Sequence, residues 1–205
     1  MKILIKDIIN ACGGRLLWGN EDGAIEAISL DSRHMEGKDL FVPIAGEKVD
    51  AHRFICQALA LGAAAVLTNV HRSPQDVREE LERFKRSGGD AQAIWDRVWI
   101  GVEDTRSALQ ALGAWRRRQI SIPIIGVTGS VGKTTTREMI AQALSAGLRV
   151  FRTPGNSNSQ VGVPITICSI PEDAQAAVIE LGMSEPGEME CIARVAQVDC
   201  GVVIN

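Results

Sequence analysis

The amino-acid sequence predicts an α/β protein with largely parallel sheets, in which a small N-terminal α/β domain precedes a second, Rossmann-like domain. Short apolar or β-branched runs alternate with longer helical segments along almost the whole chain, which is the order expected of strand–helix units. A glycine-rich turn at residues 129–132 joins one apolar run to a helical segment. The apolar and charged fractions, 45% and 23%, are those of an ordinary globular protein.

The individual elements follow from these patterns. Strands are expected at residues 25–30, 39–44, 63–68, 98–102, 122–128, 149–153, 177–181 and 201–204. Helices are expected at residues 51–61, 74–86, 105–119, 133–146 and 187–196. The helix at residues 74–86 has the clearest start, because Ser73 is a favoured cap residue and Pro74 fits the first helical turn.

The segment at residues 116–123 predicts the boundary between the two domains. A helix ends there in a basic cluster, residues 120–122 are extended, and Pro123 prevents a helix from continuing. We therefore expect one domain at residues 1–119 and a second at residues 120–205. The basic cluster at residues 116–118 is interpreted as a solvated helix end.

Charge and cysteine usage exclude several classes of protein. The formal charge of −3 gives no electrostatic reason to expect nucleic acid or an anionic membrane as the main partner. The five cysteines are far apart and have no metal-ligand spacing, which predicts buried, reduced thiols. Lys6 and Asp7 interrupt any apolar signal core, and no apolar stretch is long enough to cross a membrane. The predicted location is the cytoplasm.

The strongest chemical signal is the strand–loop–helix sequence at residues 124–135. Glycines allow consecutive backbone N–H groups to converge on a phosphate, and the N-terminus of the following helix adds a favourable dipole. Lys133 is then expected to reach the terminal phosphates, and the Thr134 hydroxyl to bind Mg²⁺. The usual phosphate-loop motif has a glycine at the position of Val127, so the generic motif is matched imperfectly.

The spelling Thr-Gly-Ser-Val-Gly-Lys-Thr-Thr resembles the shorter phosphate loop of the Mur ligases and their folylpolyglutamate synthetase relatives, and this pattern accommodates Val127. The resemblance implies that ATP is bound by Thr128, Gly129, Ser130, Val131, Gly132, Lys133, Thr134 and Thr135. Residues 155–164 resemble the GNxNNxxGxP segment of one branch of the family, with Ser159 in place of an asparagine. In this segment Asn156 and Asn158 are expected to position substrate and phosphates.

Glu180 ends an apolar strand and precedes a Leu-Gly-Met run, which is similar to the E-x-G-M signature of the same branch. An isolated glutamate at a strand end is more often solvated or a helix cap. Three matched segments in the right order favour a metal ligand instead. The resemblance thus implies that Thr134 and Glu180 hold Mg²⁺, and that Lys133 and Glu180 are catalytic.

The first domain resembles the uridine-diphosphate-sugar-binding domain of these ligases. The resemblance implies a substrate site made of Ser29, Asp31, Ser32, Arg33, Gly46, Asp50 and His52. Hydroxyl and guanidinium groups both donate hydrogen bonds to phosphate oxygens. An equally good interpretation is that Asp50 and His52 cap the helix that begins near residue 51. His34 and His71 are interpreted as surface residues, and the four tryptophans as packing residues.

The branch in question joins D-alanyl-D-alanine to UDP-N-acetylmuramoyl-tripeptide in peptidoglycan precursor synthesis. The resemblance implies ATP and Mg²⁺ as cofactors, an acyl phosphate intermediate and a monomeric parent protein. The family's downstream histidine, carbamylated lysine and C-terminal domain have no counterpart in these 205 residues. We therefore expect a fragment that is inactive alone, with an incomplete sheet whose open edge favours self-association.

Three other interpretations stay open. The sibling ligase that adds the third peptide residue is disfavoured by the asparagine-rich segment at residues 155–164. A nucleotide-binding module without catalysis fits the missing downstream residues. An unrelated phosphate-loop NTPase would hydrolyse ATP and bind no uridine nucleotide.

Overall fold

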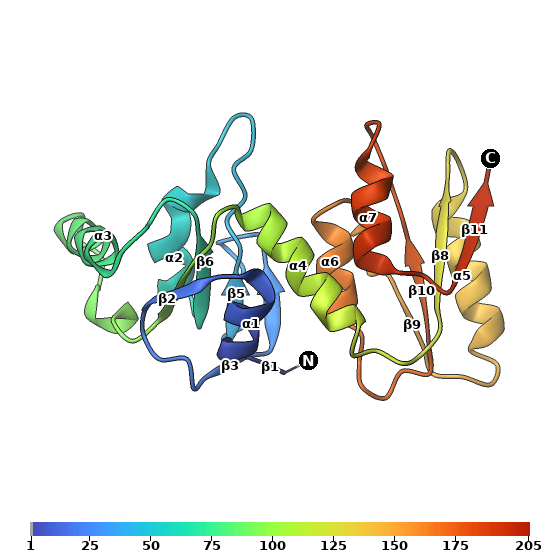
Figure 1. The fold of residues 1–205 in the computed structure, drawn as a ribbon, viewed down its shortest axis with the longest axis horizontal. Coiled ribbons are helices and arrows are strands. Elements are labelled where there is room, and N and C mark those ends of the chain that lie inside the picture. Colours follow the sequence, from blue (N-terminus) through green and yellow to red (C-terminus); the bar gives the residue numbers. More distant parts are fainter. Residues whose placement is uncertain (1) are drawn as a thin grey trace. The chain divides into compact units, whose positions relative to one another are not determined.

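The computed structural model describes residues 2–205, and its contacts divide the chain into two compact units, Lys2–Ala108 and Leu109–Asn205 (Figure 1). The division falls inside helix α4 (Thr105–Arg117), before the boundary predicted at residue 119. The second half of α4 packs on the second unit, where a Cβ atom at Gly113 would lie 2.8 Å from Pro164. The α/β class is confirmed.

The first unit is built on a five-stranded sheet in the order β2-β7-β6-β5-β4. Its strands are β2 (Arg15–Trp18), β4 (Ala27–Ser29), β5 (Asp39–Phe41), β6 (Ala65–Thr68) and β7 (Val98–Gly101). Strands β4 to β7 are parallel and only β2 is antiparallel, so the carboxyl ends of four strands meet at one edge. β5, β6 and β7 are buried along their whole length, as expected for strands covered on both faces.

The remaining elements of this unit are short. A two-stranded antiparallel sheet joins β1 (Ile3–Leu4) to β3 (Ala24–Ile25). The helices are α1 (Ile5–Cys12), η1 (Ala51–Phe54), α2 (Ile55–Ala60), α3 (Pro74–Arg86) and η2 (Gln92–Ile94). The predicted cap of α3 is confirmed, since Ser73 and Asp76 form a reciprocal capping box. The single strand predicted at residues 25–30 is instead the end of β3 followed by β4.

The second unit carries a four-stranded parallel sheet in the order β11-β8-β10-β9. Its strands are β8 (Ile124–Gly129), β9 (Val150–Arg152), β10 (Ala176–Glu180) and β11 (Cys200–Ile204). Its helices are α5 (Lys133–Leu144), α6 (Gly162–Cys168) and α7 (Glu188–Ala196), and α6 was not among the predicted elements.

Two small cores sandwich this sheet. On one face Val178 packs with Val127 and Ala141 beneath α5. On the other face its neighbours Ala177 and Ile179 pack with residues of α6 and α7. In Figure 1, α5 lies on one side of β10 and α6 and α7 lie on the other. The period of two along β10 therefore fixes which helix each side chain meets.

β11 forms an edge of the second sheet and pairs only with β8. Val203 on this strand is 80% exposed. The open edge expected from the sequence is therefore present, with an apolar side chain on it. No helix within residues 2–205 is long and apolar enough to cross a membrane.

The cysteine prediction is only partly right. No disulfide joins the five cysteines within residues 2–205, and Cys56 and Cys168 are buried as expected. Burial raises the pKa of the Cys56 thiol, and likewise that of Cys12, to about 12. Cys200, however, is exposed on the edge strand β11.

The basic cluster at the end of α4 is not simply a solvated helix end. Arg117 is buried, and its guanidinium donates to the carbonyl oxygens of Ala196 at 3.0 Å and Gln197 at 2.9 Å. It also forms an ion pair with Asp199. The Asp199 carboxylate in turn accepts a hydrogen bond from the N–H of Ile124 at the start of β8. Arg117 thus ties α4 and the end of α7 to the central strand.

Replacing Arg117 with methionine is expected to lower the free energy of unfolding by about 1–3 kcal/mol, because the buried carbonyl oxygen of Ala196 and its neighbour at Gln197 would lose a charged donor. Urea denaturation of the 205-residue chain measures this. The exposed neighbour offers a matched control, and Arg118→Met should change stability by less than about 0.5 kcal/mol. Equal effects of the two variants would contradict the structural role of Arg117.

Candidate functional site

The loop between β8 and α5 has a backbone that only glycine permits at its two ends. Gly129 has a φ of 143° and Gly132 a φ of 82°. A Cβ atom at Gly129 would lie 1.9 Å from the carbonyl oxygen of Ile204 in β11. Between them, Ser130 and Val131 are exposed. The loop thus presents its backbone at the start of α5, the arrangement that binds phosphate in other proteins.

Lys133 begins α5 and folds back over this loop. Its ammonium group donates to the carbonyl oxygen of Gly129 at 2.6 Å and lies 3.4 Å from that of Ser130. These contacts hold a positive charge directly above the loop. A flexible lysine in this place can exchange such contacts for phosphate oxygens without moving the backbone.

Glu180 ends β10 and is only 3% exposed. Its Oε2 accepts a hydrogen bond from the Thr134 hydroxyl at 2.9 Å, and its Oε1 accepts one from the Asn158 side-chain amide at 2.9 Å. The structure therefore brings together three predicted site residues from three separate segments. The carboxylate and hydroxyl oxygens are the kind of ligands that Mg²⁺ prefers.

The asparagine-rich turn contributes one of its two predicted residues to this cluster. Asn158 reaches Glu180 with its side chain, and its carbonyl oxygen accepts from the N–H of Gly182 at 2.8 Å. Asn156 is exposed and contributes only its carbonyl oxygen, which accepts from the N–H of Asn158 at 2.8 Å. Across residues 2–205 no hydrogen bond is formed by the Asn156 side chain.

Two residues of this cluster were not identified from the sequence. Thr153 follows β9, and its hydroxyl accepts a hydrogen bond from the backbone N–H of Glu180 at 2.9 Å. Arg137 lies on α5 and donates to Glu180 Oε2 at 3.3 Å. Arg137 follows Thr134 by three residues, and positions three apart share a helix face. That spacing was a signal in the sequence from which Arg137 could have been found.

The residues of this cluster fit a magnesium–nucleotide site. The glycine backbone of the loop, the Lys133 charge and the Thr134 and Glu180 oxygens converge at the carboxyl ends of β8 and β10. In the part of the chain that the structure describes, no three histidine, cysteine, aspartate or glutamate side chains gather as a metal site of their own.

The predicted substrate residues of the first unit begin at the carboxyl end of β4. Ser29 ends this strand, and its hydroxyl accepts from the N–H of Asp31 at 3.2 Å. Asp31 accepts two side-chain hydrogen bonds from Arg33, at 2.9 and 2.7 Å, and this contact holds the pKa of its carboxyl well below the usual range. Ser32 is buried beside them, whereas the Arg33 side chain is 72% exposed.

The second group of predicted substrate residues follows β5. Gly46 donates its N–H to the carbonyl oxygen of Val49, and Asp50 caps the short helix η1 by accepting from the N–H of His52. The capping interpretation of Asp50 is therefore confirmed. The same carboxylate lies 2.6 Å from Nδ1 of the buried His52, and the opposite nitrogen, Nε2, is buried without a hydrogen-bond partner among the described residues.

His71 is not a simple surface residue, contrary to the prediction. It is half-buried, its Nδ1 lies 2.9 Å from the Thr68 hydroxyl, and its ring meets Trp99 edge-on at 5.0 Å. Burial lowers the pKa of the imidazole, against the smaller opposing influence of Glu80 and Asp76. His34 is exposed as predicted.

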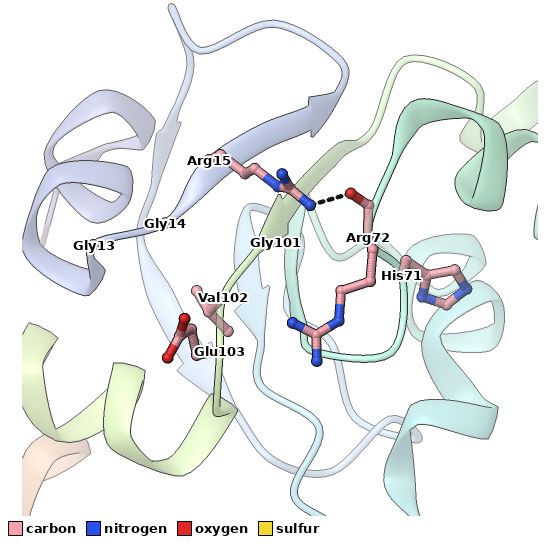
Figure 2. Close-up of a pocket in the computed structure, with 8 residues that line it drawn as sticks. All are labelled: Gly13, Gly14, Arg15, His71, Arg72, Gly101, Val102 and Glu103. Carbon is pink, nitrogen blue, oxygen red and sulfur yellow. Dashed lines mark hydrogen bonds between the residues drawn. The ribbon is translucent and has the colours of Figure 1, made fainter.

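Two cavities flank His71 in the first unit. One, of about 320 Å³, lies at the carboxyl end of β7 and contains none of the predicted substrate residues. Figure 2 shows that Arg15 there donates to the carbonyl oxygen of Arg72, with the His71 ring turned away from Arg15. The other, of about 380 Å³, is lined by Asp50 and His52. The residues at 29–33 line neither cavity.

Comparison with known proteins gives two family matches that together cover most of the chain. Residues 24–117 match the family described as Mur ligase family, catalytic domain, and residues 127–205 match the Mur ligase middle domain. UDP-N-acetylmuramoyl-tripeptide–D-alanyl-D-alanine ligase from Bacillus subtilis is 37% identical over 90% of this chain, and the Synechocystis protein of the same name is 38% identical over 91%. The chain spans only 36% and 37% of the length of these two relatives.

Solved structures agree with these matches. A crystal structure of MurF from Acinetobacter baumannii superimposes with a TM-score of 0.81 at 30% identity, covering 100% of this chain and 41% of that one. MurF ligase from Thermotoga maritima, solved in complex with ADP, gives a TM-score of 0.64 at 29% identity, covering 83% of this chain and 35% of that one.

Acidification is expected to destabilise the first unit through His71. Burial lowers the pKa of this residue in the folded protein. The contribution of the neutral imidazole to the free energy of unfolding is therefore complete only above the unfolded pKa of about 6.5. That contribution is lost as the pH falls below this value towards the folded pKa. Urea unfolding at pH 7.5 and at pH 5.5 should show a smaller loss of stability for His71→Gln than for the unmodified chain. Identical losses would contradict this role of His71.

Proposed function

Because the chain belongs to the Mur ligase family, we propose that its second unit binds the phosphates of ATP together with Mg²⁺. The observation that carries this proposal is the convergence of Lys133, Thr134 and Glu180 at the end of β8 and β10. The ADP complex of the Thermotoga maritima relative supports a nucleotide in this family. In this proposal the backbone of residues 128–135 holds the phosphates, and Lys133 neutralises the terminal ones.

Each residue of the cluster has a separate task. Glu180 accepts the hydrogen of the Thr134 hydroxyl, which leaves the lone pairs of that oxygen free for a cation. Asn158 fixes the other carboxylate oxygen, so Glu180 cannot rotate away. When bound, Mg²⁺ would supply charge neutralisation for the transferred phosphate.

We further propose that the parent protein joins D-alanyl-D-alanine to UDP-N-acetylmuramoyl-tripeptide in peptidoglycan precursor synthesis. The names of the similar Bacillus subtilis and Synechocystis proteins and the asparagine-rich turn at residues 155–164 support this branch. In the proposed reaction the tripeptide carboxylate takes the terminal phosphoryl group of ATP, and ADP leaves. The amine of the dipeptide then displaces phosphate from the acyl phosphate and loses a proton.

The uridine-diphosphate sugar is proposed to bind the first unit, with Ser29, Asp31, Ser32 and Arg33 at the diphosphate. Its support is their position at the carboxyl end of a parallel strand, where ligands bind in such sheets. Arg33 is exposed and already oriented by Asp31, so its guanidinium needs little ordering to meet phosphate oxygens. Gly46, Asp50 and His52 form a second group, of which His52 offers the buried, unpartnered Nε2. We also propose that the protein is located in the cytoplasm.

The nucleotide proposal is tested by titrating ADP with Mg²⁺ into the chain in a calorimeter. Lys133→Ala is expected to weaken binding at least about tenfold, because a charge-assisted hydrogen bond is worth about 1.5–3 kcal/mol. Arg194→Ala, which removes an exposed cation of α7, serves as the matched control and should leave binding unchanged. Undiminished binding by the folded Lys133 variant would refute the assignment of the loop.

The sugar site is tested by titrating UDP-N-acetylmuramoyl-tripeptide into the same chain. Arg33→Ala is expected to weaken binding about tenfold through the loss of one charged phosphate contact. Arg86→Ala removes an exposed arginine at the end of α3 in the same unit and should have no effect. If both variants bind as tightly as the unmodified chain, Arg33 does not contact the diphosphate.

A further inference from the structure

Arg137 is a buried cation on α5, the helix whose N-terminus forms part of the proposed nucleotide site. It is 5% exposed and lies one turn after Thr134 on α5. Its Nη1 donates to Glu180 Oε2 at 3.3 Å and to the carbonyl oxygen of Gly155 at 3.1 Å. Its other nitrogens donate to Glu138 Oε1 at 2.6 and 3.1 Å. Arg137 thus links the carboxylate at the end of β10 to the asparagine-rich turn.

The Glu180 carboxylate has no other cationic partner among the described residues. Thr134 and Asn158 donate to it as neutral groups, and only Arg137 carries a charge. A buried carboxylate is tolerated when it is both hydrogen-bonded and paired with an opposite charge. The folded chain therefore depends on Arg137 for the charge balance of this site.

We propose that Arg137 is a positioning residue that serves as a built-in counter-ion of Glu180 and holds its carboxylate in place before any metal arrives. The inference rests on the proposed function for the metal site at Thr134 and Glu180 and for the identity of the metal, Mg²⁺. Arg137 and Thr134 both lie on α5 and both donate to Oε2, and Arg137 also donates to the carbonyl oxygen of Gly155 in the turn. The carboxylate is thereby held between α5 and the turn.

This arrangement makes the stability of the unmodified chain nearly independent of free Mg²⁺. Without Arg137 the carboxylate would keep its two neutral donors and lose its charge partner. A divalent cation at Thr134 and Glu180 would then be the one counter-ion left to it, and an ion that binds only the folded state raises stability. Removal of Arg137 should therefore convert a metal-indifferent fold into a metal-dependent one.

The test is the thermal unfolding of the 205-residue chain carrying Arg137→Met, measured in EDTA and in millimolar MgCl₂ at matched ionic strength and without nucleotide. The variant is expected to lose Tm in EDTA and to recover at least half of that loss in MgCl₂. The Tm of the unmodified chain should change little between the two conditions. Arg117→Met also removes a buried arginine of the second unit, and it should lose Tm without recovering in MgCl₂.

Two further variants separate positioning from general damage. Arg137→Met combined with Glu180→Gln removes the carboxylate as well, and it should show no recovery in MgCl₂. Arg137→Lys retains a charge but has one nitrogen in place of three, so it cannot keep the contacts with Glu180, Gly155 and Glu138 together. Its recovery should therefore lie between those of the unmodified chain and the methionine variant. The lysine variant also serves as the test if the methionine variant does not fold.

Several outcomes would overturn the inference. They are an Arg137→Met protein as stable as the unmodified chain in EDTA, a loss of Tm that MgCl₂ does not reduce, or an equal recovery by Arg117→Met. The titration of ADP into the Lys133 variant distinguishes this failure from failure of the proposed function. Normal ADP binding that depends on Lys133, together with metal-independent unfolding of Arg137→Met, would reject only the role of Arg137.

Discussion

The buried carboxylate of Glu180 is the interaction on which the second unit depends. A charge at the end of a central strand is stable only when donors surround it, and here they come from separate parts of the chain. α5 supplies a hydroxyl and a guanidinium, and the turn before α6 supplies an amide. The start of α5 and the path of the asparagine-rich turn are thus both linked to the end of β10 by the hydrogen bonds of one side chain.

In the first unit, by contrast, polar side chains pair with close neighbours in the sequence. Asp31 and Arg33 satisfy each other at the surface, and Asp50 satisfies both the start of η1 and one nitrogen of His52. Nε2 of His52 is an exception, as are Oδ1 of Asn69 and Nε1 of Trp99, because each is buried and has no partner within residues 2–205. Buried polar atoms normally find a hydrogen bond, so an incoming group at His52 would supply one that the chain itself leaves unmade.

The sequence predicted the phosphate loop and most strands because those features are local. Glycine spacing and the Lys133-Thr134 pair are visible within a few residues, and Ser73 followed by Pro74 predicts the start of α3 in the same way. The elements before residue 24 were not predicted, because β1 and β2 have only two and four residues and pair with distant strands. Arg117 was misjudged for a similar reason, since its partners at residues 196–199 lie far along the chain.

The contact between Gly129 and β11 determines when the phosphate loop can reach its final structure during synthesis. Gly129 lies beside Ile204, and the fit is so close that a methyl group at Gly129 would collide with the backbone of that residue. Ile204 belongs to β11, so the strand that the loop packs against is synthesised after the loop itself. On the ribosome, residues 129–132 emerge early but acquire their final surroundings only when β11 has docked beside β8. The maturation of this loop thus waits for the synthesis and docking of β11.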